Sequence, residues 1–242
     1  MSVIIELRDV WKIYKEGEEG EVDALKEVSL HIRKGDFIAV MGPSGSGKTT
    51  AMNLIGSLDV PTKGKIFLDG HNISHLSESD LAQVRGRRIG FIFQQFNLIP
   101  NLTAKENVIL PMIFQGKDEL ERELRAEELL KMVELEGRMD HYPSELSGGQ
   151  QQRVAIARAL ANDPEVILAD EPTGNLDTHS GEIVMKFLNK LNDMGRTVII
   201  VTHSPEVAMK HSRKIYWIKD GQIEKITEKT KGNWKEHKPK KF

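Results

Sequence analysis

The sequence predicts an α/β fold with a largely parallel sheet, interrupted by an all-helical insertion. Short runs rich in Val and Ile alternate with segments that carry apolar residues at helical spacing, which is the pattern of βα units. Residues 97–162 lack such strand-like runs and carry consecutive helical patterns instead. A chain of 242 residues is long enough for one large domain with an inserted subdomain.

Strands are expected where a short apolar or β-branched run is bounded by turn-forming residues. The dipeptide Asp220-Gly221 separates the last two of these runs and is typical of a hairpin turn. In chain order, the expected strands are Val3–Val10, Val28–Ile32, Phe37–Met41, Lys65–Leu68, Ile89–Phe93, Val166–Ala169, Thr197–Val201, Lys214–Ile218 and Gln222–Ile226.

Helices are expected where apolar residues recur at intervals of three and four. Three helices should follow one another in the insertion, from a capping box at Thr103 through Ile113 and then at about 118–136 and 148–161. The segment 178–194 has Asp177 placed to cap it and shows the helical pattern clearly, with one apolar face formed by Val184, Phe187, Leu188 and Leu191.

Composition narrows the possible functions. The net charge of −2 gives no reason to expect nucleic acid as the main partner. The absence of cysteine excludes disulfides and cysteine metal sites, and fits a reducing cytoplasm. The N-terminus does not resemble a signal peptide, and the longest apolar runs are strand-sized, so any membrane role requires a partner protein.

The last segment, residues 228–242, contains six lysines and two acidic residues without periodicity. We expect a solvated, flexible end. The alternative is that its lysines, with Trp234 and Phe242, touch lipid headgroups.

Residues 42–49 fit the phosphate-loop pattern between an expected strand and a helix at Thr50–Leu58. Glycines in such a loop let backbone N–H groups approach phosphate oxygens. Lys48 would reach the β- and γ-phosphates, and the Thr49 hydroxyl would bind Mg²⁺. The residues expected to contact the nucleotide are Gly42, Ser44, Gly45, Ser46, Gly47, Lys48, Thr49 and Thr50.

Two carboxylates, Asp170 and Glu171, end the expected strand Val166–Ala169. Ligands of open α/β sheets bind beyond the carboxyl ends of the strands. Asp170 would therefore lie near the metal ion, and Glu171 could polarise a water against the γ-phosphate.

A second glycine-rich helix start forms the segment Leu146-Ser147-Gly148-Gly149-Gln150. Read physically, it is another anion site at a helix N-terminus. Together with the phosphate loop, this segment resembles the signature of the ATP-binding cassette (ABC) family, and the resemblance extends over almost the whole chain. It implies a P-loop NTPase (RecA-like) core with an N-terminal antiparallel β region and MgATP as the ligand.

The resemblance also implies that two copies pair head to tail. The signature of each copy then closes over the ATP of the other through Ser147, Gly148, Gly149 and Gln150. Gly174-Asn175-Leu176-Asp177 matches the D-loop between the two sites. His203 matches the switch histidine on the γ-phosphate.

Two further site residues follow from the resemblance. Gln94 matches the Q-loop glutamine that contacts Mg²⁺ and the attacking water, with Gln95 the other choice. Tyr14 matches the aromatic residue that stacks on adenine, with Trp11 as the alternative. The implied catalytic set is Glu171, His203, Gln94 and Lys48, and the implied metal ligands are Thr49, Gln94 and Asp170.

The expected domain organisation is one ABC ATPase domain. Its nucleotide-binding core would comprise residues 1–96 and 163–227, its helical signature subdomain residues 97–162, and its flexible tail residues 228–242. The expected function is ATP hydrolysis that powers a separate membrane permease from the inner, cytoplasmic face of the cell membrane. The permease would dock near the Q-loop and helical subdomain, with candidate contacts at Phe96, Leu98, Ile99 and Leu102.

Finer features place the chain with one branch of the family. The stretches 93–100 and 169–177 resemble the lipoprotein-release, macrolide-efflux and cell-division ATPases. That branch implies an exporter or a machine that transmits motion to its membrane subunit. The alternatives are a solute importer subunit, a soluble ABC ATPase acting on DNA or ribosomes, and a regulatory module without catalysis.

Overall fold

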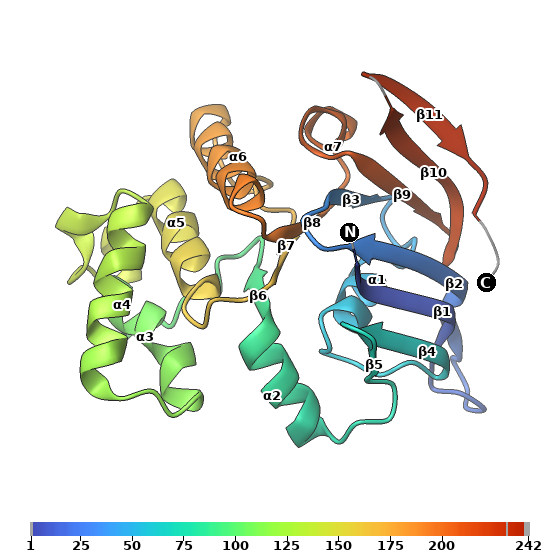
Figure 1. Cartoon of the computed structure of the whole chain (residues 1–242), viewed down its shortest axis with the longest axis horizontal. Helices are drawn as coiled ribbons and strands as arrows, with labels where there is room; N and C mark the ends of the chain where they lie inside the picture. The colour runs from blue at the N-terminus through green and yellow to red at the C-terminus, as the bar shows by residue number, and fades with distance from the viewer. Residues whose placement is uncertain (1, 231, 240–242) are drawn as a thin grey trace. The chain divides into compact units, whose positions relative to one another are not determined.

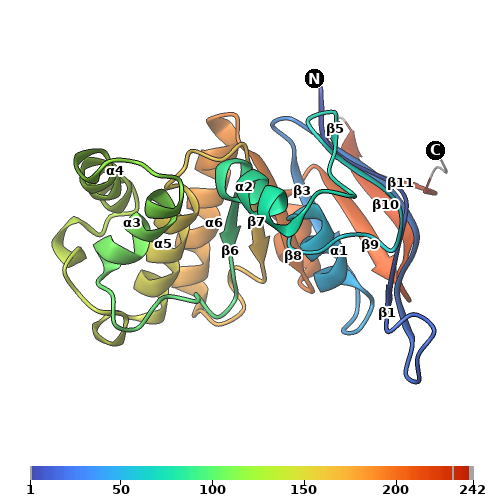
Figure 2. The same ribbon diagram turned by 90° about the horizontal axis from the view of Figure 1, so that it is seen from below.

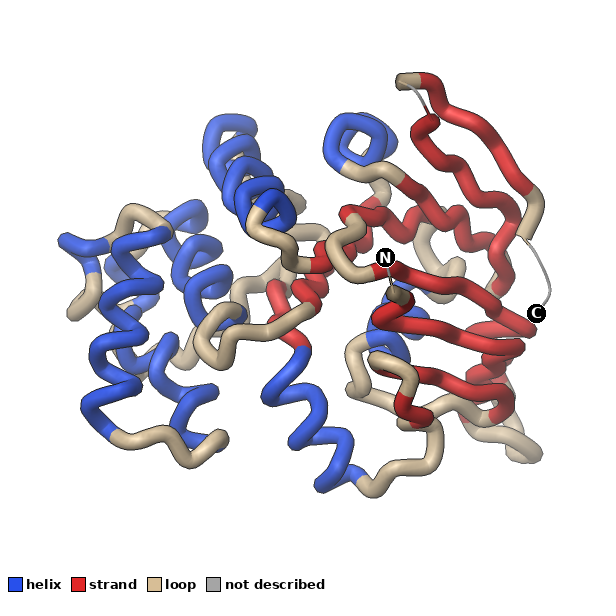
Figure 3. Tube along the Cα trace, viewed as in Figure 1, coloured by secondary structure: helices blue, strands red, loops and turns tan. Residues whose placement is uncertain are grey.

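The computed structural model describes residues 2–230 and 232–239, and the chain forms two compact units. We call residues 1–83 with 197–242 the strand-rich unit, and residues 84–196 the helix-rich unit. Figure 3 shows strands predominating in the first and helices in the second. The predicted α/β fold class is confirmed.

The N-terminal part of the strand-rich unit is an antiparallel sheet. Its strands are hydrogen-bonded in the order β2-β1-β4-β5. They comprise β1 (Val3–Tyr14), β2 (Val22–Arg33), β4 (Lys63–Leu68) and β5 (His71–Asn72). This sheet is the antiparallel region that the family resemblance implied. β1 and β2 are longer than expected because cross-strand pairing continues through half-buried and exposed residues as far as Tyr14 and Val22.

The second sheet of this unit carries the phosphate loop. β3 (Phe37–Met41) pairs in parallel with β8 (Thr197–Thr202) and β9 (Lys214–Lys219). Every residue of β3 and β8 is buried, which explains why both read as unbroken apolar runs. Figure 1 shows these strands with α1 (Lys48–Ile55) and α7 (Pro205–His211), the helices of this unit that follow β3 and β8 in the chain.

The expectation of a flexible segment from residue 228 is wrong for the residues that the structure describes. β10 (Gln222–Thr230) and β11 (Asn233–His237) form an antiparallel hairpin on the β9 edge. Lys225 Nζ lies 2.9 Å from the Glu236 carboxylate across this hairpin. Cross-strand pairing of opposite charges lets a polar sequence form strands that an apolar pattern does not reveal. Residues 240–242 lie outside the described part of the chain.

The helix-rich unit contains a parallel strand pair, β6 (Ile89–Ile92) with β7 (Val166–Asp170). Gly90 of β6 permits close approach of α5, because a Cβ there would lie 2.3 Å from the Ala159 carbonyl oxygen. Figures 1 and 2 show α3, α4 and α5 lying against one another, and α5 also packs on β6 and α6. The helices of this unit are α3 (Ala104–Phe114), α4 (Glu119–Met132), α5 (Gly148–Ala159) and α6 (Thr178–Asp193), with 3-10 turns at Glu136–Arg138 and Pro143–Glu145.

The expected helix starts are confirmed in detail. Thr103 and Glu106 form a reciprocal capping box at α3, and Asp177 caps α6 through the Ser180 N–H. The expected core-facing side chains of α6, including Val184 and Leu188, are buried. The limits proposed for the helical subdomain, residues 97–162, stay a prediction, since the compact unit also includes β6, β7 and α6.

Sequence periodicity missed α2 (Glu78–Arg88), which carries the chain from one unit to the other. Only Leu81 of α2 is buried, so the helix has no apolar stripe to detect. Its start is stabilised instead by Ser77, whose hydroxyl accepts the Asp80 N–H. No helix within residues 2–230 and 232–239 has the length and apolar character needed to cross a membrane.

Candidate nucleotide-binding site

The phosphate loop connects β3 to α1 with two glycines in the left-handed region. Gly45 has φ +75° and Gly47 has φ +101°, and Gly47 is the N-cap of α1. L-residues adopt this region at a cost, which explains the glycines at these positions. Lys48 Nζ donates to the carbonyl oxygens of Gly42 and Pro43 at 2.9 and 2.8 Å, so its ammonium group is held within the loop.

Two segments that are distant in sequence contact the backbone of the phosphate loop. The Gly221 N–H donates to the Ser46 carbonyl at 3.0 Å, and the Lys26 N–H donates to the Gly221 carbonyl at 2.8 Å. A Cβ on Gly47 would lie 2.5 Å from the Ala24 carbonyl oxygen. β2 and the β9–β10 turn therefore fix the backbone of the phosphate loop.

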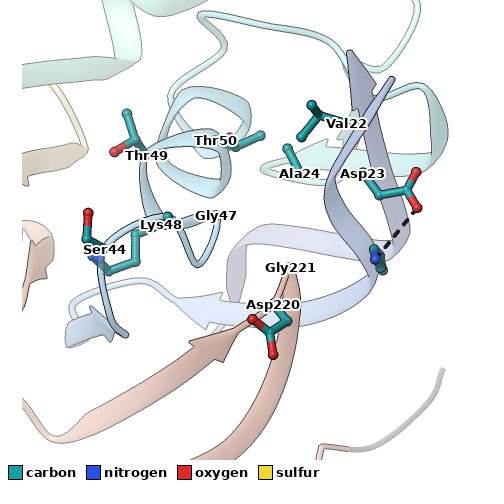
Figure 4. A pocket seen from close by; sticks show the side chains of 12 residues that line it. Val22, Asp23, Ala24, Ser44, Gly47, Lys48, Thr49, Thr50, Asp220 and Gly221 are labelled. Carbon is teal, nitrogen blue, oxygen red and sulfur yellow. Dashed lines mark ion pairs between the residues drawn. The ribbon is translucent and has the colours of Figure 1, made fainter. Parts of the chain in front are cut away.

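A cavity of about 400 Å³ opens beside this loop. Figure 4 shows the phosphate loop on one side, with the start of β2 and the Asp220-Gly221 turn facing it. The turn was predicted as a hairpin but not as part of the site, because only the fold brings it to the loop. The lining residues are Val22, Asp23, Ala24, Lys26, Ser44, Gly45, Gly47, Lys48, Thr49, Thr50, Asp220 and Gly221.

The loop and its cavity fit a polyphosphate. The Ser46 hydroxyl is buried and has no hydrogen-bond partner among the described residues. The first N–H groups of α1 lie beyond the reach of acceptors within the helix, so they can bind an anion. Lys48 supplies the positive charge that a triphosphate requires.

Tyr14, the expected adenine contact, is 38% exposed at the end of β1. It pairs across the sheet with Val22, which lines the cavity, although Tyr14 itself does not. Its hydroxyl donates to the Asp59 carboxylate at 3.2 Å, and partial burial is the main cause that raises the pKa of this phenol. Its role as the adenine stacker stays a prediction.

In the helix-rich unit, the signature segment begins α5 through a capping box. The Ser147 hydroxyl accepts the Gln150 N–H at 3.3 Å, and the Gln150 side chain accepts the Ser147 N–H at 2.8 Å. A Cβ on Gly149 would lie 2.6 Å from the Ser180 hydroxyl, so only glycine fits beside the start of α6. At this helix start Ser147 is exposed, and Gly148, Gly149 and Gln150 are half-buried.

The D-loop contacts both the signature and the Q-loop. Asp177 accepts the backbone N–H and the hydroxyl of Ser180, and these hydrogen bonds hold the pKa of the Asp177 carboxyl below its usual range. Asn175 donates to the Gln94 carbonyl at 3.0 Å and accepts from the Gln94 side chain at 3.4 Å. A Cβ on Gly174 would lie 2.9 Å from Gln94 Nε2, so Gly174 allows this approach.

The acidic pair ends β7. Asp170 is the last residue of the strand, and Glu171 follows it with φ +44°. A non-glycine residue in this region is uncommon, and such residues are enriched at functional sites. Gln152 of α5 is buried and donates to the Pro172 carbonyl at 2.8 Å, which ties the acidic segment to the signature helix.

His203 follows β8 in the strand-rich unit and is exposed. The structure therefore places the phosphate loop and His203 in one unit, and Gln94, the acidic pair and the signature in the other. The expected metal ligands supply a hydroxyl, an amide and a carboxylate oxygen, from Thr49, Gln94 and Asp170. Oxygen donors of this kind suit Mg²⁺, so the donor set fits the expected metal.

Comparison with known proteins agrees with these features. A family model described as ABC transporter matches residues 25–174. An uncharacterized ABC transporter ATP-binding protein of Thermotoga maritima is 54% identical over 226 residues, covering 93% of this chain and 96% of that protein. The macrolide export ATP-binding/permease protein MacB of Mannheimia succiniciproducens is 52% identical over 226 residues, which cover 93% of this chain but 35% of MacB.

A solved structure gives the same result. The dimeric post-hydrolysis state of the cassette MJ0796 of Methanocaldococcus jannaschii, bound to ADP and Pi, is similar with a TM-score of 0.85 and 50% identity. The match covers 93% of this chain and 98% of that chain. The resemblance found in the sequence is thereby confirmed, and the chain belongs to the ABC transporter family as an ATP-hydrolysing cassette.

Proposed function

We propose that this protein hydrolyses MgATP as a head-to-tail homodimer and thereby drives a separate membrane permease. The observation that carries the proposal is the presence of two polar helix starts in one chain. α1 with its lysine suits the phosphates of one ATP, and the start of α5, where Ser147 is exposed, suits the phosphates of a second. The dimeric MJ0796 cassette supports the pairing of two copies.

Each residue type then has a defined task in the hydrolysis. Lys48 neutralises charge on the β- and γ-phosphates, and Ser147 of a second copy donates toward the same ATP. Glu171 accepts a proton from the attacking water, while Gln94 and His203 orient the water and the γ-phosphate. When bound, Mg²⁺ neutralises charge on the phosphate oxygens and is held by Thr49, Gln94 and Asp170.

The permease would dock on an exposed apolar patch at the turn between α3 and α4. Phe114 is 75% exposed and Leu120 is 69% exposed, and exposed apolar side chains that gather on one part of a surface are typical of interaction sites. We define this docking patch by its residues Ile113, Phe114, Leu120 and Leu124.

Of the four contacts expected from the sequence, only Ile99 is exposed in the structure. Phe96 lies against the start of α5, because its ring is 3.6 Å from the position of a Cβ on Gly148. The docking patch on α3 and α4 is therefore the better candidate for the permease surface.

We also propose export rather than import, with the protein bound peripherally at the cytoplasmic face of the cell membrane. The support is the similarity to MacB, whose name describes a macrolide export ATP-binding/permease protein. The name of MacB describes an ATP-binding part and a permease together, and this chain spans 35% of that protein.

Phe114→Glu should abolish association with the permease, since a charge in a desolvated apolar contact is strongly unfavourable. The measurement is a pull-down from native membranes with tagged protein and MgATP. Met194→Glu is the matched control, because Met194 is a 58% exposed apolar residue at the end of α6, outside the docking patch.

Recovery of a membrane protein with few spans and a large extracytoplasmic domain, lost only with Phe114→Glu, supports the proposal. A many-span permease recovered with a solute-binding protein would point to import. Equal recovery with both variants would show that the docking patch is not the contact.

A further inference from the structure

The Q-loop has an unusual backbone immediately after Gln94. Phe96 and Asn97 are consecutive non-glycine residues with φ +55° and +50°. A bulky residue such as Phe96 adopts this conformation at an energetic cost unless surrounding contacts stabilise it, whereas Asn tolerates it better. Some part of the fold must therefore hold this loop in place.

Arg158, near the end of the signature helix α5, makes that contact. Its two terminal nitrogens donate separately to the carbonyl oxygens of Phe96, at 2.8 Å, and of Asn97. The planar guanidinium fork suits two adjacent acceptors in a way that a lysine ammonium does not. One side chain therefore fixes both residues of the strained pair.

The positive charge of Arg158 is stabilised by its hydrogen bonds to these two carbonyl oxygens. Partial burial lowers the pKa of this guanidinium, and no carboxylate among the described residues opposes that shift. Arg158 is half-buried, and a partly desolvated charge without a counter-ion is unfavourable unless it makes strong hydrogen bonds. If position 158 served only for packing, an apolar side chain would fill it without the free-energy cost of desolvating a charge.

The same helix touches the Q-loop at its start. The Phe96 ring lies against Gly148 in the signature, and Asn175 of the D-loop bonds to Gln94. α5 runs from Gly148 to Ala159, so the Phe96–Gly148 contact and the Arg158 hydrogen bonds belong to one rigid element. A displacement of the signature must move the Q-loop backbone with it.

We propose that Arg158 is a positioning residue that locks the Q-loop in its left-handed conformation and so couples Gln94 to the signature helix. The coupling part rests on the proposed function, in which Gln94 orients the attacking water. Loss of the fork would release the loop without removing any group that touches ATP.

The test uses Arg158→Gln, with Arg158→Lys as the conservative variant and Arg153→Gln as the matched control. Arg153 lies on the same helix and pairs with Glu134 at 3.5 Å, so the control removes an equal charge away from the Q-loop. Hydrogen exchange of residues 94–98 measures how firmly the loop backbone is held. Steady-state kinetics measures the consequence for ATP hydrolysis.

We expect Arg158→Gln to accelerate exchange in residues 94–98 by about tenfold or more, as for a lost charged hydrogen bond. The kcat for ATP hydrolysis should fall by roughly tenfold, and KM for ATP should change less than about twofold. The reason is that Arg158 positions the Q-loop and does not contact ATP. Arg158→Lys should restore part of the kcat, and Arg153→Gln should resemble the wild type in both readouts.

Unchanged exchange in residues 94–98 would overturn the assignment of Arg158 to the loop, and faster exchange with a normal kcat would overturn its coupling to Gln94. Should Arg158→Gln fail to fold, the same comparison is made with Arg158→Lys, which keeps the charge and loses the fork. Failure of the proposed function is seen separately, as absence of ATPase activity in the wild type, while exchange still decides whether Arg158 holds the loop.

Discussion

Glu171→Gln should bind ATP with wild-type affinity and hydrolyse it about 10²–10⁴-fold more slowly, as expected when a general base is removed. The amide keeps the shape of the side chain but cannot accept a proton from water at neutral pH. ATP binding should survive because the phosphate loop belongs to a different segment of the chain. Single-turnover hydrolysis and a nucleotide titration measure the two quantities separately.

The structure supports this choice of residue. Glu171 directly follows β7 and adopts φ +44°, a left-handed conformation that is unfavourable for a residue other than glycine. Its carbonyl accepts the Gly174 N–H at 2.9 Å, which fixes the segment between the acidic pair and the D-loop. Glu182→Gln, on the exposed side of α6, is the matched control and should hydrolyse ATP normally. Normal turnover by Glu171→Gln would remove Glu171 from the role of base.

Gly47→Ala should weaken ATP binding by roughly 30-fold or more, which corresponds to about 2 kcal/mol of strain in the phosphate loop. An added Cβ would lie 2.5 Å from the Ala24 carbonyl and 2.9 Å from a Leu25 methyl group, at φ +101°. Neither the backbone of β2 nor the loop can move without shifting the first N–H groups of α1. Titration with a fluorescent ATP analogue measures the loss.

Gly116→Ala is the control that separates the strain of a positive φ from the steric contact of an added Cβ in the phosphate loop. Gly116 also has a positive φ, +71°, but nothing lies within 4 Å of its Cβ position, and it lies outside the phosphate loop. This control should lose some thermal stability and keep wild-type ATP affinity. If Gly47→Ala bound ATP normally, the loop would not need the backbone geometry described above.

The chemistry of the site was predictable wherever it is encoded in contiguous residues. The phosphate loop could be located because glycines at positive φ, a lysine and a helix start must be adjacent in sequence to bind phosphate. The caps at Thr103 and Asp177 were predictable for a similar reason, since a cap and its helix are neighbours. The roles of Gln94, His203 and Tyr14 rest on the family resemblance and stay predictions.

Contacts between distant segments could not be predicted from the sequence. The start of β2 and the Asp220-Gly221 turn reach the nucleotide cavity only through sheet formation. Arg158 resembles any charged helix residue until the fold places it on the Q-loop carbonyls. The hairpin of β10 and β11 was missed because its strands are polar and pair by charge. α2 was missed because it buries a single apolar side chain.

The most direct test is the molecular mass of Glu171→Gln in solution, measured by light scattering with and without MgATP. We expect a monomer without nucleotide and a dimer with MgATP, because two signatures close over two ATP molecules that cannot be hydrolysed. Ser147→Arg added to the same variant should leave it monomeric while ATP still binds. A protein that stayed monomeric with saturating MgATP, or a Ser147→Arg variant that dimerised normally, would contradict an ATP-driven dimer built from the phosphate loop and the signature.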